Sequence, residues 1–281
     1  MKKLLFLLTT PLLFTGCSNK GTPEPLEVFE GSDYGAFLGR SDNDVNYFKN
    51  YSFVSLELDE FTDTNISRLA NKGVQFFAYL NIGSLETYRD YYEEYESFTF
   101  KDYDEWPDEK WIDVSNQSWQ NFVVNTLAKG FKERNAFGVY LDNIDVYTIA
   151  KEEGKNFTAY AEGLKNIIKG VSNLGLKVMI NGGSEFLDDM NDENSDVFDY
   201  IWAYHQEEVF SLITDYEHNG FGKQTDEDRE YYQQIASMMK EKGKQIFFLE
   251  YTIDTDLKKE IRNYCNSHEY HFYIATDVDL K

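Results

Sequence analysis

Cysteine and histidine are scarce in this chain, and each shortage excludes a class of protein. The 281 residues contain 2 Cys and 4 His. Two cysteines cannot build the disulfide framework of a small secreted domain, so a hydrophobic core must stabilise the fold. No histidine has metal-site spacing beside a cysteine or a second histidine on one helix face, and His268 and His271 flank a predicted helix-to-strand turn. Phosphate-loop, dinucleotide and serine-hydrolase motifs are missing as well. We therefore expect no metal and no cofactor.

Positive charge is also in short supply. Lys and Arg number 27 against 50 Asp and Glu, which gives a formal net charge of −23. Phosphate backbones and anionic lipids attract basic proteins, so this balance argues against a nucleic-acid partner and against electrostatic adhesion to a membrane. An acidic chain suits a cationic partner, although solubility alone also accounts for such a charge.

The apolar run at residues 4–14 is too short to cross a bilayer as a helix. It follows two lysines and precedes Gly16 and Cys17, and this arrangement is typical of a secretory signal peptide. Gly16-Cys17 resembles a bacterial lipoprotein signal, in which the cysteine becomes the first residue and carries lipid. Phe14 departs from the leucine that is usual at its position. An ordinary cleaved signal with a chance cysteine is the alternative.

This start predicts the domain organisation. Residues 1–16 form the signal peptide, residues 17–27 a flexible tether with two prolines, and residues 28–281 one large domain. Loss of the two lysines in the signal takes the charge from −23 to −25. We expect a monomer that is exported and lipid-anchored to the outer face of the bacterial cell membrane. With Cys17 lipidated, Cys265 has no partner and is expected in the core.

Eight short apolar runs, separated mostly by segments with helical spacing, predict an α/β fold, a single (β/α)8 TIM barrel. Buried strands of a parallel sheet have this pattern. The runs are 34–38, 53–56, 75–80, 138–141, 176–180, 200–204, 245–249 and 271–275. Glycines end several of the intervening helices. A doubly wound sheet stays an alternative, because the pattern does not prove closure.

Polar residues follow these runs, where α/β folds bind their ligands. They are Glu57, Asn81, Asp142, Asn181, Glu207, Glu250 and Asp277. Carboxylates and amides without cofactor motifs suggest acid–base chemistry on a glycosidic bond, which needs one protonated and one ionised carboxyl. Asp142 and Glu207 follow the fourth and sixth runs, which leaves room for a sugar between them. Glu208 rivals Glu207, because successive strand residues point to opposite faces. Asp142 taken alone is also compatible with a helix cap.

The longest interruption between two runs, residues 84–117, is rich in aromatic side chains. Trp106 and Trp111 are among them. A long aromatic segment at the active end of a barrel is typical of a substrate-binding wall.

At the level of motifs, the chain resembles the endo-α-1,4-polygalactosaminidase family of glycoside hydrolases, family 114, a TIM-barrel group. Five segments carry this resemblance in order and extend over nearly all of residues 34–280. They are 78–83 followed by Glu86 and Arg89, 106–114, 137–147, 206–210 and 248–252. The family usually has Asp-Gly where this chain has Phe137-Gly138, a difference that does not touch the catalytic aspartate.

The resemblance implies an enzyme that cuts α-1,4-linked galactosamine polymers with Asp142 and Glu207. It also implies binding or orienting roles at matched positions. Together with the strand-end and aromatic residues, the expected substrate-binding set is Asn81, Glu86, Arg89, Trp106, Trp111, Asp145, Tyr147, Asn181, Glu250 and Tyr251. A partly deacetylated polymer is cationic and fits the acidic chain. The alternative is a lipid-tethered carbohydrate-binding protein without catalysis, but such proteins are usually two-lobed and no second domain is visible.

We predict that Cys17 is the mature N-terminus and carries lipid. Replacing Cys17 by Ser should move the protein from the membrane pellet to the soluble fraction, because serine offers no thiol for the lipid and the acidic domain has no electrostatic affinity for anionic lipids. Fractionation followed by immunoblotting measures this. Membrane pelleting of the Ser variant equal to that of the natural chain would contradict the prediction.

Overall fold

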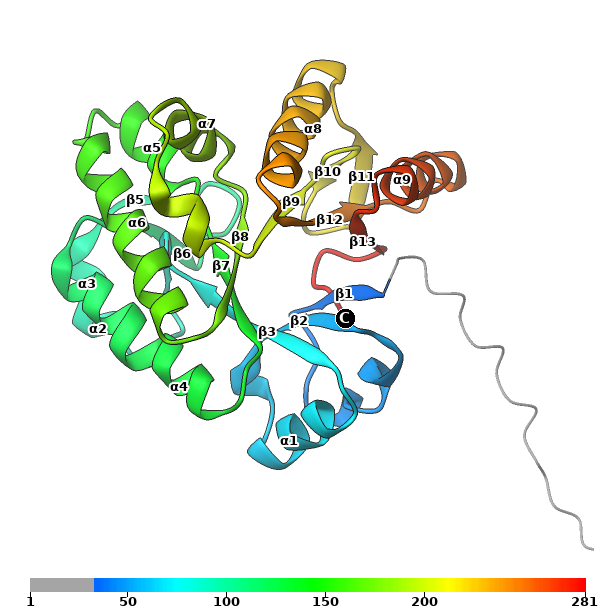
Figure 1. Ribbon diagram of the computed structural model, residues 1–281, viewed down its shortest axis with the longest axis horizontal. Coiled ribbons are helices and arrows are strands. Elements are labelled where there is room, and N and C mark those ends of the chain that lie inside the picture. Colours follow the sequence, from blue (N-terminus) through cyan, green and yellow to red (C-terminus); the bar gives the residue numbers. More distant parts are fainter. Residues whose placement is uncertain (1–32) are drawn as a thin grey trace, which may run out of the picture.

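The computed structural model describes residues 33–281, so the expected signal peptide, tether and lipidation site lie outside the described residues. Eight parallel strands form one sheet whose order follows the chain (Figure 1). They are β1 (Tyr34–Phe37), β2 (Phe53–Leu56), β3 (Gln75–Asn81), β7 (Gly138–Asp142), β8 (Lys177–Asn181), β9 (Ala203–Glu207), β12 (Gln245–Tyr251) and β13 (His271–Ala275). The order never reverses, as it would in a doubly wound sheet.

The first and last strands of this sheet, β1 and β13, are neighbours in space. The rings of Phe37 and Tyr273 are 5.1 Å apart at their centroids. Beyond the strands, the backbone N–H of Gly39 donates to the carbonyl oxygen of Leu280 at 3.3 Å. The sheet is therefore a nearly closed barrel, and the predicted single (β/α)8 TIM barrel is confirmed.

The helices surround the sheet on its outer side (Figure 1). They are α1 (Asp63–Asn71), α2 (Tyr92–Tyr95), α3 (Gln117–Phe122), α4 (Lys129–Glu133), α5 (Val146–Glu152), α6 (Phe157–Asn173), α7 (Ser184–Asp192), α8 (Asp226–Glu241) and α9 (Thr255–His268). A π-helical turn, η5 (Val123–Ala128), joins α3 to α4. None of the helices within residues 33–281 is long and apolar enough to cross a membrane.

Short 3-10 helices fill some of the remaining connections. They are η1 (Asp42–Asp44), η2 (Tyr47–Asn50), η3 (Leu58–Glu60), η4 (Glu96–Phe98) and η6 (Asp196–Tyr200). Helix η6 explains why one strand begins later than predicted. The run at 200–204 was expected to be a strand from its first residue. The Ser195 hydroxyl accepts a hydrogen bond from the backbone N–H of Val197 and starts η6. Strand β9 therefore begins at Ala203 and includes Glu207 as its last residue.

Two antiparallel sheets interrupt the barrel pattern at its active end. The first contains β4 (Ser84–Glu86), β5 (Thr99–Asp102) and β6 (Glu109–Ile112), in the order β4-β6-β5. The second is a hairpin of β10 (Ser211–Asp215) and β11 (Gly220–Lys223). The aromatic segment at 84–117 is thus largely folded structure and not an open loop.

The hydrophobic core has two parts, because each barrel strand is buried on both faces. The larger part lies between the strands and the helices. The smaller part fills the barrel interior and includes Tyr34, Phe77, Tyr79, Tyr140, Phe247 and Tyr251. Rings from the starts of the strands pack tightly there, with Phe77 and Trp202 at 5.5 Å between centroids. The barrel interior is therefore closely packed at its N-terminal end, and the larger cavity lies at the carboxyl ends of the strands.

Gly83 lies after β3, where the backbone of another segment comes too close for any side chain. A methyl group on Gly83 would overlap the carbonyl oxygen of Asn143. We expect Gly83→Ala to lower the free energy of unfolding by roughly 1–3 kcal/mol, because backbone must move to relieve the overlap.

Gly130 is a matched control, since it lies in α4 and a methyl group there meets nothing within 4 Å. Gly130→Ala should raise the free energy of unfolding by about 0.5–1 kcal/mol, because alanine favours the helix. Urea denaturation of both variants measures the two changes. Equal effects of the same sign would contradict the packing argument.

Candidate active site

Three adjacent strands bring the expected catalytic residues to one rim of the barrel. Asp142, Asn181 and Glu207 are the last residues of β7, β8 and β9. Side chains alternate between the two faces of a strand, so these three point into the barrel with Tyr140, Met179 and His205, each two residues earlier. All lie at the carboxyl ends of the strands, beside a cavity of about 1120 Å³.

One amide group bridges the two candidate catalytic carboxyls. The Asn181 Nδ2 atom donates to Asp142 Oδ1 at 2.8 Å and to Glu207 Oε1 at 2.7 Å. These two oxygens can be no farther apart than the sum of these distances, about 5.5 Å. This upper limit agrees with the carboxyl spacing of retaining glycosidases, about 5–5.5 Å, and lies below the roughly 6.5–9.5 Å of inverting ones.

Asp142 is held by donors of two kinds. Its Oδ1 atom also accepts from the backbone N–H of Asn143 at 2.9 Å, and its Oδ2 atom accepts from the Tyr79 hydroxyl at 2.8 Å. Burial raises the pKa of Asp142, while the hydrogen bonds from Asn181, Tyr79 and Asn143 oppose this rise. N–H groups can only donate, so the two that meet at Oδ1 favour the ionised carboxylate.

Glu207 accepts hydrogen bonds from two tyrosines in addition to Asn181. Tyr140 donates to Oε1 at 3.1 Å, and Tyr251 donates to Oε2 at 2.6 Å. Burial raises the pKa of Glu207, and the negative charge of Asp142 raises it further. The Oε2 atom has a hydroxyl as its partner, and a hydroxyl can accept as well as donate. A proton on Glu207 can therefore be held at Oε2.

Glu208 also lines the cavity, so both members of the Glu207–Glu208 pair face it. The strand ends at Glu207, and Glu208 has a φ of 57°, which turns the chain and frees the side chains from strict alternation. Glu208 Oε1 accepts from the backbone N–H of Ile213 in the hairpin, and burial raises the pKa of Glu208 to about 8. Glu207, and not Glu208, contacts the Asn181 bridge.

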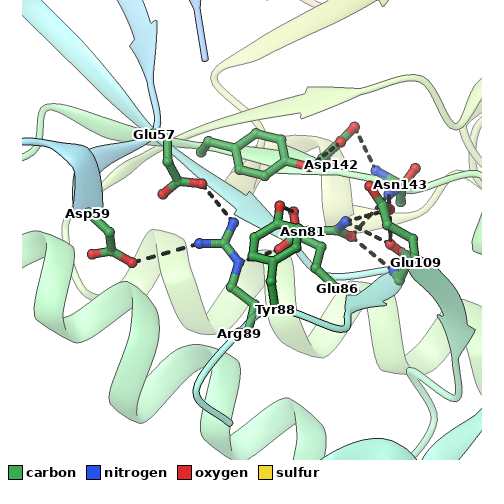
Figure 2. A network of polar contacts seen from close by, with 11 residues as sticks. Glu57, Asp59, Asn81, Glu86, Tyr88, Arg89, Glu109, Asp142 and Asn143 are labelled. Carbon is green, nitrogen blue, oxygen red and sulfur yellow. Dashed lines mark hydrogen bonds and ion pairs between the residues drawn. The ribbon is translucent and has the colours of Figure 1, made fainter. Parts of the chain in front are cut away.

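Arg89 lies among carboxylates on one side of the cavity (Figure 2). Its guanidinium forms ion pairs with Glu86, with Glu57 at 2.7 Å and with Asp59 at 3.8 Å. Glu86 comes from β4 of the inserted sheet and Glu57 follows β2, so the arginine ties the insertion to the barrel. Its positive charge is thereby neutralised within the wall.

A second polar cluster joins the inserted sheet to the catalytic rim (Figure 2). The Asn143 side chain donates to Asn81 Oδ1 at 3.0 Å, and Asn81 Nδ2 donates to Glu109 at 3.1 Å. Ser84 also donates to Glu109. Burial raises the pKa of Glu109 to about 7, with further contributions from the charges of Glu86 and Asp142. Asn81 is buried, and its hydrogen bonds to Asn143 and Glu109 hold the inserted sheet against the barrel.

The other expected binding residues separate into two groups. Glu86, Arg89, Trp106, Asp145, Asn181 and Tyr251 line the cavity. Burial raises the pKa of Asp145 to about 6, and its Oδ1 atom accepts from the backbone N–H of Gly183.

Trp111, Tyr147 and Glu250 lie away from the cavity, and their placement as substrate contacts needs correction. Trp111 stacks on Tyr103 with centroids 4.4 Å apart. Tyr147 donates to Asp189 at 2.6 Å on the helical side. Glu250 is fully buried beneath the start of the hairpin, where it accepts from backbone and hydroxyl of Ser211. Each side chain is occupied by packing or by fold-stabilising hydrogen bonds.

Some residues of the site were not anticipated, among them Tyr79, Tyr140, His205 and Glu109. Tyr79, Tyr140 and His205 lie two positions before strand-end residues, so the period of two along a strand could have indicated them. Glu109 offers no such signal, because its approach to Asp142 depends on how the inserted sheet folds back over the barrel.

A barrel with two coupled carboxyls at the ends of its fourth and sixth strands has the site of a two-carboxylate glycoside hydrolase. The family model for glycoside hydrolase family GH114 matches residues 20–280. The chain therefore belongs to family GH114 and is a glycoside hydrolase.

Solved structures share this fold at low sequence identity. The glycoside hydrolase domain of PelA from Pseudomonas aeruginosa is 16% identical with a TM-score of 0.73, and the match covers 89% of this chain and 97% of that one. Ega3 from Aspergillus fumigatus, solved in complex with galactosamine, is 15% identical with a TM-score of 0.70, and the match covers 94% and 98%. A comparison with curated proteins gives no match.

The coupling between the two carboxyls leads to a measurable prediction. Since the charge of Asp142 raises the pKa of Glu207, Asp142→Asn should lower that pKa. Carbon-13 NMR titration of glutamate-labelled protein measures it, with the signal assigned by its loss in Glu207→Gln. Asp59→Asn is a matched control at the exposed rim and should leave the value unchanged. An unchanged or higher pKa in Asp142→Asn would show that the charges are not coupled.

Proposed function

We propose that this protein is an exported, lipid-anchored enzyme that hydrolyses internal α-1,4 linkages of galactosamine-rich polysaccharide. The observation that carries the proposal is the Asn181-bridged pair of carboxyls at the bottom of a strongly acidic cavity. Family membership and the similarity to a protein solved with galactosamine support the same class of substrate.

The charge of the cavity supports a cationic polymer. Twelve Asp and Glu side chains line the cavity against three Arg and Lys. Arg89 is already paired with Glu57 and Glu86, so it offers little positive charge to a ligand. A concave site with one sign of charge concentrates ligands of the other sign. Free amino groups on galactosamine units would meet that field, whereas N-acetylated units are neutral.

The hydrogen bonds support different roles for the two carboxyls. Asp142 is the ionised group because two N–H donors meet at its Oδ1 atom. Glu207 is the protonated group, because burial and the charge of Asp142 raise its pKa and its tyrosine partner at Oε2 can accept a hydrogen bond from the proton.

The spacing of about 5.5 Å or less indicates a double displacement. Glu207 donates its proton to the glycosidic oxygen as the C1–oxygen bond breaks, and Asp142 forms a bond to C1. Water then gives a proton to Glu207 while its oxygen replaces Asp142 at C1. The product keeps the α configuration, and both carboxyls return to their starting states.

The test is digestion of deacetylated α-1,4-galactosamine oligomers, followed by mass spectrometry and proton NMR. The natural chain should release shorter oligomers as α anomers. Asp142→Asn and Glu207→Gln should each lower kcat by about 10³-fold or more, because each removes a group that reacts in the transition state. Their melting temperatures should stay close to that of the natural chain.

Glu208→Gln is the matched control, since it makes the same substitution one residue away and outside the amide bridge. It should keep most of the activity. Near-full activity in Glu207→Gln with loss in Glu208→Gln would reverse the assignment. No cleavage of any amino-sugar polymer would overturn the substrate, and preferred cleavage of fully N-acetylated oligomers would overturn the role of the acidic cavity.

A further inference from the structure

His205 lies directly beneath the catalytic rim, and the chemistry proposed above does not use it. It is on β9, two residues before Glu207, and its side chain is fully buried. Its Nδ1 atom is 2.7 Å from Asn181 Oδ1 and 3.2 Å from the Tyr140 hydroxyl. Its Nε2 atom is buried and has no hydrogen-bond partner among residues 33–281.

These contacts determine which ring nitrogen carries the proton. A carbonyl oxygen can only accept, so the close contact with Asn181 Oδ1 requires an N–H at Nδ1. Burial lowers the pKa of His205 to about 3, so the ring is neutral and has only one N–H. The proton is therefore on Nδ1, and Nε2 is the unprotonated nitrogen inside the barrel.

The Nδ1–H of His205 and the two carboxyls favour the same orientation of the Asn181 amide. With its oxygen accepting from His205, Asn181 presents both N–H bonds to Asp142 and Glu207. The reverse orientation would place the amide oxygen against the two carboxyls and remove a donor from each. The observed orientation adds a donor that stabilises an ionised Asp142, beside those from Asn143 and Tyr79.

We propose that His205 is a positioning residue, which locks the Asn181 amide so that both of its N–H groups face the catalytic carboxyls. The expected effect of His205 on turnover rests on the proposed function. The tautomer of the His205 ring does not depend on the substrate. Because Nδ1 already carries a proton, the Tyr140 hydroxyl cannot donate to it and donates to Glu207 at 3.1 Å instead. One buried ring thus sets the direction of hydrogen bonds that reach both carboxyls.

The kinetic test compares His205→Leu with His205→Asn. Leucine removes the donor, whereas the asparagine amide nitrogen occupies nearly the position of Nδ1 and can restore it. His205→Leu should lower kcat by about 10²-fold with little change in KM. The acidic limb of its kcat/KM profile should move to higher pH, because Asp142 loses a donor that favours its ionised form. His205→Asn should recover most of both effects.

A role in packing alone gives a different pattern. Activity would then fall in proportion to stability in both variants, and the acidic limb would stay in place. That result would overturn the proposal. It would also be overturned if His205→Asn had the melting temperature of the natural chain but did not return the acidic limb of the kcat/KM profile to its original pH.

Nitrogen-15 NMR of histidine-labelled protein tests the tautomer without any substrate. The signal that disappears in His205→Asn should show a protonated Nδ1 and an unprotonated Nε2, constant between about pH 5 and 8. A protonated Nε2 would overturn the proposal. If the tautomer is as expected but galactosamine polymers are not cut, then the proposed substrate fails and the positioning role stands.

Discussion

Two carboxyl groups that share one amide are the constraint on which this site depends. Like charges at such short range cannot both be ionised without cost in a poorly solvated place. Asn181 lowers that cost by donating to both, and further donors are the backbone N–H of Asn143 and the hydroxyls of Tyr79, Tyr140 and Tyr251. The surroundings therefore keep two acids close together while allowing them different protonation states, as glycosidic bond cleavage requires.

The barrel interior supports this arrangement in layers. Aromatic rings such as Phe77 and Trp202 close the end where the strands start. Tyrosine hydroxyls and the neutral ring of His205 form the next level, and the carboxyls of Asp142 and Glu207 lie above them. Each step follows from the period of two along a strand, which turns every second residue inward. A close-packed base leaves the polar side chains few alternative rotamers, so their hydrogen bonds are preorganised.

The inserted sheet between β3 and β7 completes the wall of the cavity. Glu86 and Glu109 approach from it, and Arg89 fixes it to Glu57 of the barrel. Because the positive charge of Arg89 is paired with these carboxylates, the wall of the cavity remains acidic. The same insertion stacks Trp111 on Tyr103, so this tryptophan helps to hold the sheet together. Other aromatic residues of the segment line the cavity, namely Tyr88, Tyr91, Tyr103 and Trp106.

The sequence by itself determined the succession of strands and helices, because apolar runs, helical stripes and terminal glycines are local patterns, whereas the closure of the sheet between β1 and β13 was decided by the tertiary structure. It also placed Asp142, Asn181 and Glu207 at one rim, since parallel strands end at the same edge. Only the tertiary structure decided that Glu207 joins the Asn181 bridge, that Glu250 supports a hairpin and that Glu109 reaches the site. Those outcomes depend on how segments far apart in the chain fold over one another, and no local pattern encodes such contacts.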